Sequence, residues 1–238
     1  MLEDPLDNAL SNPVSPISQL FRREGAAMML EEERVLFVDG EEADAVYLVT
    51  SGVLRCCLIS EDGRRHIFSF PGAGRLLGLP FAARRHFTAE AVSRARVLVL
   101  PLPHLEKAAQ RSPELVRAQR RYVRDELRQR ERHLLRIASL PAEARLRGFL
   151  AEFTRQAGKD LQLASGFVSL PMSRRDIADH LGLTLETVSR AFGALRRRGQ
   201  LELLGKAAFR LEREANERAA PAIVQLRAPG SAGADLTG

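Results

Sequence analysis

Hydrophobic residues in the first half of the chain occur in short runs that turn residues separate. The runs cover residues 35–38, 45–49, 53–59, 66–70 and 97–100. β-Rich runs at a spacing of about 8–12 residues are typical of an antiparallel sandwich or barrel. Residues 60–64 lie between two of these runs and contain Asp62-Gly63, a pair that favours the tight turn of a hairpin.

The pattern becomes helical after Pro103. Residues 113–140 contain no Gly and no internal Pro, which predicts a helix of roughly 25 residues and about 37 Å. Arg120 and Arg130 interrupt an apolar stripe that consists of Val116, Val123, Leu127, Leu134 and Ile137. A core helix can carry such a stripe, but its charged flanks favour a coiled coil of two chains. We therefore predict a dimer interface at this stripe.

Two short helices with a turn between them are predicted after Pro171, downstream of an amphipathic helix at 141–162. Ser173 followed by Asp176 has the form of a capping box at a helix start. Gly182 ends this helix, and Thr184 is suited to begin the next one. A helix, a turn of about three residues and a second helix are the sequence form of a helix-turn-helix.

The second of these helices carries side chains that suit the major groove of DNA. Arg190 can donate two hydrogen bonds to a guanine, and Glu186 can accept one from a cytosine. Residues 196–198 are three arginines that suit phosphate contacts, and residues 201–204 and 209–211 predict a two-stranded wing. An ordinary helical hairpin with a solvated Glu-Arg face is the alternative. The predicted DNA-binding residues are Ser173, Arg174, Thr184, Glu186, Thr187, Ser189, Arg190 and Arg197.

The distribution of charge supports a polyanion partner. The 238 residues have a formal net charge of +6. Residues 1–105 carry 11 basic and 14 acidic side chains, residues 106–138 carry 10 and 5, and residues 139–238 carry 15 and 11. A sensor or scaffold domain joined to a basic, polyanion-binding domain has this asymmetry, although chance variation in surface charge also produces it.

Several classes of protein are disfavoured. No apolar run approaches the ~18–20 residues of a membrane span, and the first residues lack the features of a signal peptide. Cys56 and Cys57 are the only cysteines, too few for a disulfide framework. The sequence contains no nucleophile elbow, no Walker loop and no H-E-x-x-H motif. We expect a cytoplasmic protein that is not an enzyme and does not contact a membrane.

The segment GLTLETVSR at 182–190 resembles the recognition segment of the CRP/FNR superfamily of transcription regulators, and the resemblance extends over nearly the whole chain. Glu186, Ser189 and Arg190 match the E-x-x-S-R signature of the FNR-like and FixK-like branches. The cyclic-AMP-responsive branch usually has Arg at the position of Leu185 and Gly at that of Ser189. The resemblance implies a target like TTGAT-N4-ATCAA.

The same resemblance implies an α+β fold with an N-terminal antiparallel β-roll of the cyclic-nucleotide-binding type, a long dimerisation helix and a C-terminal winged helix-turn-helix. The expected division has five parts. These are a flexible N-terminal arm (1–17), the β-roll (18–105), the dimerisation helix (106–140), the winged helix-turn-helix (141–218) and a flexible C-terminal tail (219–238).

No ligand of the β-roll is favoured by the sequence. In the family, a cyclic-nucleotide site contains G-E-x-G followed by R-S/T-A. The comparable segments here, 74–78 and 87–89, lack the ribose-binding Glu and have Phe87 in place of the phosphate-binding Arg. Arg84 and Arg85 are candidates to replace that Arg. An iron–sulfur cluster is excluded because the first 55 residues hold no Cys.

The remaining candidate ligands are thiols and imidazoles. Cys56 and Cys57 are adjacent on a predicted strand and should point to opposite faces, one into the core and one accessible for oxidation. Ordinary strand cysteines are the alternative. The five histidines have no metal-binding spacing, although haem or metal ligation by one of them is conceivable. We expect neither a cofactor nor a metal.

These observations predict a homodimer that binds double-stranded DNA without a small-molecule effector. The resemblance to the FixK-like branch implies that it activates genes of microaerobic metabolism, denitrification or nitrogen fixation, and we expect RNA polymerase as a partner. The alternative is a regulator of the same superfamily that haem, nitric oxide or another effector gates allosterically.

Overall fold

The computed structural model describes residues 15–79, 83–205 and 207–212. Within them, the N-terminal half forms two antiparallel four-stranded sheets, ordered β1-β8-β3-β6 and β2-β7-β4-β5. The strands are β1 (Ala26–Leu30), β2 (Val35–Phe37), β3 (Ala45–Ser51), β4 (Leu54–Ile59), β5 (Arg65–Ser69), β6 (Leu76–Leu77), β7 (Thr88–Ala91) and β8 (Ala95–Pro101). The predicted antiparallel β-roll is thereby confirmed.

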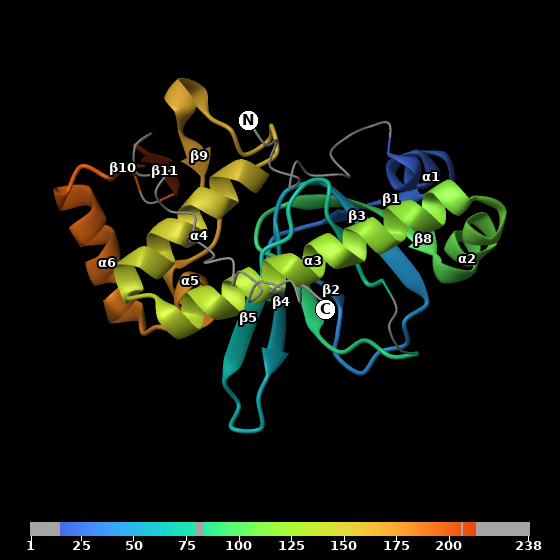
Figure 1. Cartoon of the computed structure of the whole chain (residues 1–238), viewed down its shortest axis with the longest axis horizontal. Helices are drawn as coiled ribbons and strands as arrows, with labels where there is room; N and C mark the ends of the chain where they lie inside the picture. Colours follow the sequence, from blue (N-terminus) through green and yellow to red (C-terminus); the bar gives the residue numbers. More distant parts are fainter. Residues whose placement is uncertain (1–14, 80–82, 206, 213–238) are drawn as a thin grey trace, which may run out of the picture.

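The hairpin predicted at residues 60–64 joins β4 to β5. Gly63 has a positive φ of 76°, which the turn requires, and its amide donates to the carbonyl of Ser60 at 2.8 Å. In Figure 1 this hairpin projects away from the body of the molecule. The sequence pattern did not predict β1, β6 and β7, because these strands are short or contain Ala in place of β-branched residues.

The last residues of the predicted N-terminal arm are helical in the structure. Helix α1 (Pro16–Glu24) begins inside the segment predicted as an arm, and Ile17 and Phe21 are fully buried in a cluster shared with the long helix. The apolar side chains therefore order this part of the chain. Residues 1–14 and the predicted tail at 219–238 lie outside the described residues.

The predicted long helix is α3 (Pro113–Ser139). The segment 106–140 is not one helix, because Ser112 ends α2 (Leu102–Arg111) and caps α3 by accepting from the amide of Leu115. Tyr122 fixes α3 to β6, since its hydroxyl donates to the Leu76 carbonyl and accepts from the Leu76 amide, both at 3.0 Å. Figure 1 shows α3 running from the β-roll to the C-terminal unit.

The C-terminal unit is a winged helix-turn-helix, as predicted. Its elements are α4 (Ala142–Gln156), the 3-10 turn η1 (Ala164–Gly166), β9 (Val168–Ser169), α5 (Arg174–Leu181), α6 (Leu185–Arg197), β10 (Leu201–Leu204) and β11 (Ala208–Leu211). The three strands pair antiparallel in the order β10-β11-β9. Helix α4 ends at Gln156, before the predicted residue 162.

The hydrophobic core of this unit continues into the β-roll. Val53, Ile67 and Phe70 of the roll belong to the same buried cluster as Phe149 of α4 and Ile177 of α5. The rings of Phe70 and Phe149 have centroids 5.8 Å apart. The β-roll and the winged helix-turn-helix are therefore packed against each other in this structure.

Candidate DNA-binding site

Helix α5 begins with the predicted capping box. The Ser173 hydroxyl accepts from the Asp176 amide at 3.0 Å, and the Asp176 carboxylate accepts from the Ser173 amide at 3.1 Å. The Ser173 hydroxyl also donates to the same carboxylate at 2.7 Å. The side chain of Ser173, predicted to contact DNA, is thus already engaged in starting the helix.

The turn between α5 and α6 is built as predicted. Gly182 adopts a left-handed φ of 62°, and the Leu183 amide donates to the Ala178 carbonyl at 3.0 Å. Leu183 packs against the core cluster, and Thr184 caps α6 by accepting from the Thr187 amide at 3.2 Å. These local contacts set the direction in which α6 leaves the turn.

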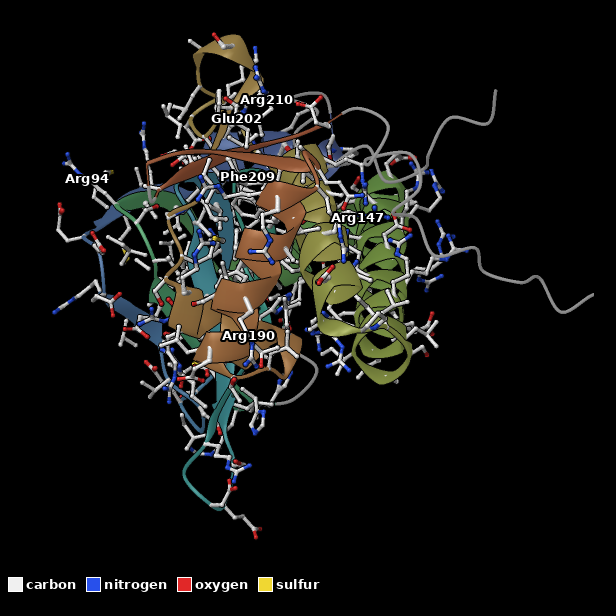
Figure 2. The ribbon with its side chains drawn as sticks, turned by 90° about the vertical axis from the view of Figure 1, so that its left-hand side faces the viewer. Arg94, Arg147, Arg190, Glu202, Phe209 and Arg210 are labelled. Atoms are coloured by element: carbon white, nitrogen blue, oxygen red, sulfur yellow. The ribbon has the colours of Figure 1, made fainter. Side chains whose placement is uncertain are left out.

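Helix α6 has one buried and one exposed face. Val188, Phe192 and Leu195 are buried, whereas Glu186, Ser189 and Arg190 are exposed. Figure 2 shows α6 in front, with Arg190 on its surface. The exposed side chains therefore come from the N-terminal half of the helix, the part that meets base edges in helix-turn-helix proteins.

The exposed polar groups are linked to the start of α6. Arg190 Nη2 donates to the Thr187 hydroxyl at 3.3 Å, and the Thr187 and Thr184 hydroxyls lie 3.0 Å apart. The amide of Glu186 itself, followed by the Thr184 hydroxyl and the charge of Arg190, lowers the pKa of Glu186. Glu186 is therefore ionised at neutral pH and can act only as a hydrogen-bond acceptor.

The arginines around α6 are not equivalent. Arg197 is exposed near the end of α6, whereas Arg198 forms an ion pair with Glu143 of α4. Arg174 is half-buried, with its guanidinium carbon 3.1 Å from the centroid of the Phe192 ring, and burial lowers the pKa of Arg174 to about 10. A DNA contact by Arg174, unlike one by Arg190, requires the side chain to leave this ring.

The wing lies beside the end of α6. Arg210 of β11 forms an ion pair with Glu202 of β10 and donates to the Ser165 carbonyl at 2.8 Å. Its guanidinium also stacks over Phe167, 4.8 Å from the ring centroid. Figure 2 shows Glu202 and Arg210 together on the wing strands, so these contacts brace the wing internally.

The predicted interface stripe runs along α3. Leu127 and Leu134 are 57% and 66% exposed, and the adjacent Leu135 is also exposed. Val116, Val123 and Ile137 are half-buried. An apolar stripe left open on a long helix is the surface that a second chain covers in a coiled coil.

A cavity of about 310 Å³ lies between the β-roll, α3 and α4. Its wall includes Phe68, Arg130, His133, Phe149 and His180. Phe87 belongs to this wall and is itself buried, edge-on to Phe37 and Phe68 with centroids 5.2 Å away in each case. The position expected to bind a nucleotide phosphate is therefore occupied by an aromatic core residue.

The two arginines considered as replacements have other partners. Arg85 is buried and donates to the carbonyls of Gly78 and Ala45 at 2.8 and 2.6 Å, while Arg84 donates to the Gly40 carbonyl at 2.7 Å. Their side chains serve to hold loops of the roll in place.

The prediction that one of the two adjacent thiols is accessible is wrong. Cys56 and Cys57 belong to different buried clusters, as expected for opposite faces of β4, but both are 4% exposed or less. Burial raises the pKa of Cys56 to about 12 and also raises the pKa of Cys57. Buried protonated thiols are poor nucleophiles, so the structure gives no support to a redox site here.

Some features of the site were not visible in the sequence. Asp176, predicted only as a capping residue, also contacts Arg55 and Arg65 of the β-roll, which are more than 100 residues away. No local pattern reveals such a pairing. In the part of the chain that the structure describes, no cluster of three or more His, Cys, Asp or Glu side chains could hold a metal ion.

A β-roll, a long helix with an open apolar stripe and a winged helix-turn-helix with Glu, Ser and Arg exposed on its second helix together define a DNA-binding transcription regulator. Residues 28–112 match the family described as cyclic nucleotide-binding domain, and residues 170–201 match the bacterial regulatory proteins of the crp family. None of the helices within the described residues combines the length and apolar character that crossing a membrane requires.

Comparison with known proteins places the chain within this class. The nitrogen fixation regulation protein FixK of Azorhizobium caulinodans is 37% identical over 179 residues, which cover 75% of this chain and 72% of that protein. The anaerobic regulatory protein of Haemophilus influenzae is 30% identical over 183 residues, covering 74% and 69%. The structure of FixK2 from Bradyrhizobium japonicum has a TM-score of 0.76 and 33% identity, covering 82% of this chain and 96% of that one. The chain therefore belongs to the CRP/FNR superfamily of transcription regulators, is similar to its FixK proteins, and is not an enzyme.

Proposed function

We propose that the protein is a homodimeric activator that recognises a palindrome of the form TTGAT-N4-ATCAA. The observation that carries this proposal is the exposure of Glu186, Ser189 and Arg190 along the N-terminal half of α6. Their side chains match the donors and acceptors of a G·C pair and its neighbours in the major groove. Arg190 donates to the guanine, Glu186 accepts from the cytosine, and Ser189 contacts a neighbouring thymine or the backbone.

Two α6 helices are needed to read both halves of a palindrome, about 34 Å apart along the DNA. The exposed Leu127 and Leu134 support a parallel seam between two α3 helices. Removing these leucines from water favours association, because each buried leucine contributes about 1.5–3 kcal/mol.

The regulator acts without a cyclic nucleotide in this proposal. The burial of Phe87 and the commitment of Arg85 to main-chain carbonyls support it, because neither position offers a free cation to a phosphate. The names of two relatives, a nitrogen fixation regulation protein and an anaerobic regulatory protein, support a role in nitrogen fixation or in anaerobic gene control. We propose that this role includes microaerobic and denitrification genes and that it is exerted in the cytoplasm through RNA polymerase.

The test is binding of the purified protein to a labelled TTGAT-N4-ATCAA duplex without additives, compared with a duplex changed at the G·C pairs. We expect binding to the palindrome only, with no change on addition of millimolar cyclic AMP. Equal affinity for both duplexes contradicts the proposed target, and binding that requires cyclic AMP contradicts effector independence.

The dimer is tested with the double variant Leu127→Glu/Leu134→Glu. Four carboxylates facing each other along a dry seam disfavour association by several kcal/mol, so this variant should sediment as a monomer and lose palindrome binding. The control Arg128→Glu places a carboxylate at an exposed position outside the stripe and should remain a dimer. A double variant that sediments as a dimer shows that the seam lies elsewhere.

The cavity favours one second candidate function, which is gating of DNA binding by an effector. Its wall combines aromatic rings with Arg130, His133 and Glu152, a composition suited to a small ligand with an apolar body and polar groups. An absorption spectrum and a native mass spectrum of the purified protein distinguish the two functions. A haem band or a retained small molecule supports gating, and a ligand-free protein that binds the palindrome supports the first proposal.

A further inference from the structure

The β-roll and the helix-turn-helix are joined by a group of ion pairs at the start of α5. Arg65 of β5 donates to Asp176 at 2.6 Å and to Asp179 at 2.9 and 3.0 Å. Arg55 of β4 lies 3.5 Å from Asp176 and also pairs with Glu33 and Glu90. All four carboxylates therefore converge on two arginines of the roll.

The two oxygens of Asp176 have different partners. Oδ2 accepts from the amide and the hydroxyl of Ser173, which starts α5, whereas Oδ1 faces Arg65 and Arg55. The side chain is only 5% exposed, so both sets of contacts are largely shielded from water. One carboxylate thereby connects the first helix of the DNA-binding unit to the roll.

Two further hydrogen bonds join the winged helix unit to the roll. His180 Nδ1 donates to the carbonyl of Ile67 in β5 at 3.0 Å, in the tautomer that this carbonyl requires. On the far side of the interface, Asp160 accepts from the Gly52 amide at 2.7 Å. The polar contacts therefore hold the winged helix unit at separate points, with the shared apolar cluster between them.

We propose that Arg65 is a positioning residue for DNA binding. Its paired contacts to Asp176 and Asp179 fix the angle between α5 and the β-roll, and the turn at Gly182 transmits that angle to α6. In a dimer joined through α3, this link sets the distance and rotation between the two recognition helices. The DNA part of this inference rests on the proposed function.

A fixed angle has a consequence that a general loss of stability does not have, namely a strict spacer length. One added base pair shifts a half-site by about 3.4 Å and rotates it by roughly 35°. Two rigidly held α6 helices cannot follow both changes, whereas two loosely held ones can. The preference for N4 over N3 and N5 spacers therefore measures how firmly the recognition helices are positioned.

The experiment compares the full-length wild type with Arg65→Ala, Arg65→Lys and the control Arg64→Ala. Arg64 lies on the same hairpin, is 79% exposed and pairs with Asp62. Affinity is measured for palindromes with N3, N4 and N5 spacers at several salt concentrations. We expect Arg65→Ala to lower N4 affinity about tenfold and to reduce the spacer preference by a similar factor. Arg64→Ala should match wild type, and Arg65→Lys should fall between wild type and Arg65→Ala.

The base preference and the salt dependence separate positioning from direct contact. Arg65→Ala should discriminate the G·C pair as wild type does and keep the same salt slope, because Arg65 holds carboxylates and not phosphates. A salt slope lowered by about two units, one for each Arg65 of the dimer, identifies Arg65 as a phosphate contact and overturns the proposal. An unchanged spacer preference also overturns it, since the α3–α4 connection alone then positions α6.

Amide hydrogen exchange gives a test that does not need DNA. In Arg65→Ala, amides of α5 and β5 should exchange about tenfold faster than in wild type, while the β1–β8 pair should be unchanged. If Arg65→Ala does not fold, Asp179→Asn replaces it in the same measurements, because this change weakens the link without burying a new group. Unchanged exchange in α5 refutes the link between Arg65 and α5, even if the protein binds no palindrome. Failure of the wild type to bind any palindrome refutes only the proposed function.

Discussion

Helices α5 and α6 are neighbours in one structural motif, yet their outer faces meet different surroundings. Both begin with a hydroxyl cap, at Ser173 and at Thr184. The outer face of α5 is covered by the β-roll through Asp176, Asp179 and His180, whereas that of α6 is bare. The covered face of α5 carries Asp176 and Asp179, whereas the open face of α6 carries Glu186 and Arg190. This contrast agrees with the proposal that α5 anchors the motif and α6 reads DNA.

The largest expected effect comes from the shared carboxylate. Asp176→Ala removes the carboxylate half of the capping box and the partner that Arg65 and Arg55 share. Because both arginines keep other carboxylates, the free energy of unfolding should fall by about 3 kcal/mol in urea titrations, the lower end of the range for breaking a buried ion pair. Asp176→Asn keeps an acceptor for Ser173 but not the charge. If Asp176→Asn is as stable as wild type, the covered face of α5 depends on capping alone.

The next effect concerns the open face of α6. Arg190→Ala should cost about 1–3 kcal/mol of binding free energy per half-site and relax the preference at one G·C pair, with no change in stability. The matched change Arg197→Ala should weaken all sequences alike and lower the salt slope by about one unit per half-site, about two for the dimer. Fluorescence anisotropy with the palindrome and its G·C variants measures both. An Arg190 variant that still discriminates the pair as wild type does shows that another residue reads it.

Acid should loosen the covered face of α5 and not the open face of α6. The ring of His180 stacks on His133 of α3 with centroids 4.2 Å apart, and burial is the main cause that lowers the pKa of each. Arg136 lowers both pKa values further, and Glu152 raises that of His133. Above pH 6.5 both histidines are neutral in the folded and in the unfolded chain, so they do not change the stability. Below it, only the unfolded chain takes up these protons, so stability falls by up to about 1.4 kcal/mol per pH unit per histidine.

This pH dependence is measured by urea unfolding at pH 7.5 and 5.5. The double variant His133→Gln/His180→Asn should lose less stability between these values than wild type does. His66→Gln, which changes an exposed side chain of β5, serves as the control and should behave like wild type. If the double variant and the wild type lose the same stability between the two pH values, the acid sensitivity comes from other groups.

The smallest effect is expected at the cap of the open helix. Thr184→Ala removes one hydroxyl acceptor from an exposed helix start and should lower the free energy of unfolding by about 1 kcal/mol. The difference from Asp176→Ala then gives the contribution of the roll to α5. A loss as large as that of Asp176→Ala contradicts the assignment of α6 as the uncovered helix.

The parts of this protein that the sequence predicted are those with local causes. Ser173 and Asp176, Gly182 and Thr184 act within a few residues of themselves, so the helix-turn-helix and its wing followed from the pattern. Strand β7 was not predicted because Thr88-Ala89-Glu90-Ala91 has little β-propensity and is held by pairing with β2 and β4. The register of the sheets and the burial of both cysteines depend on residues far along the chain.

The residues of the DNA-binding site could likewise be predicted only where their placement has a local cause. Exposure of Glu186, Ser189 and Arg190 follows from helical periodicity once α6 is placed. The ring stacking of Arg174 on Phe192 and the pairing of Arg65 with Asp176 and Asp179 depend on tertiary contacts. Periodicity identifies the face of a helix, but it does not identify what covers that face.

The buried cluster that crosses from the β-roll to the winged helix unit also determines how the protein should come apart. Val53 and Phe70 on one side share their apolar neighbours with Phe149 and Phe192 on the other, so neither unit keeps a complete core without the other. Such a chain is expected to unfold in one cooperative transition, although its sensor-like and DNA-binding parts are distinct in role. A winged helix unit expressed alone would expose Phe149 and leave Asp176 without its arginines. We therefore expect the functional boundary in this regulator not to be a folding boundary.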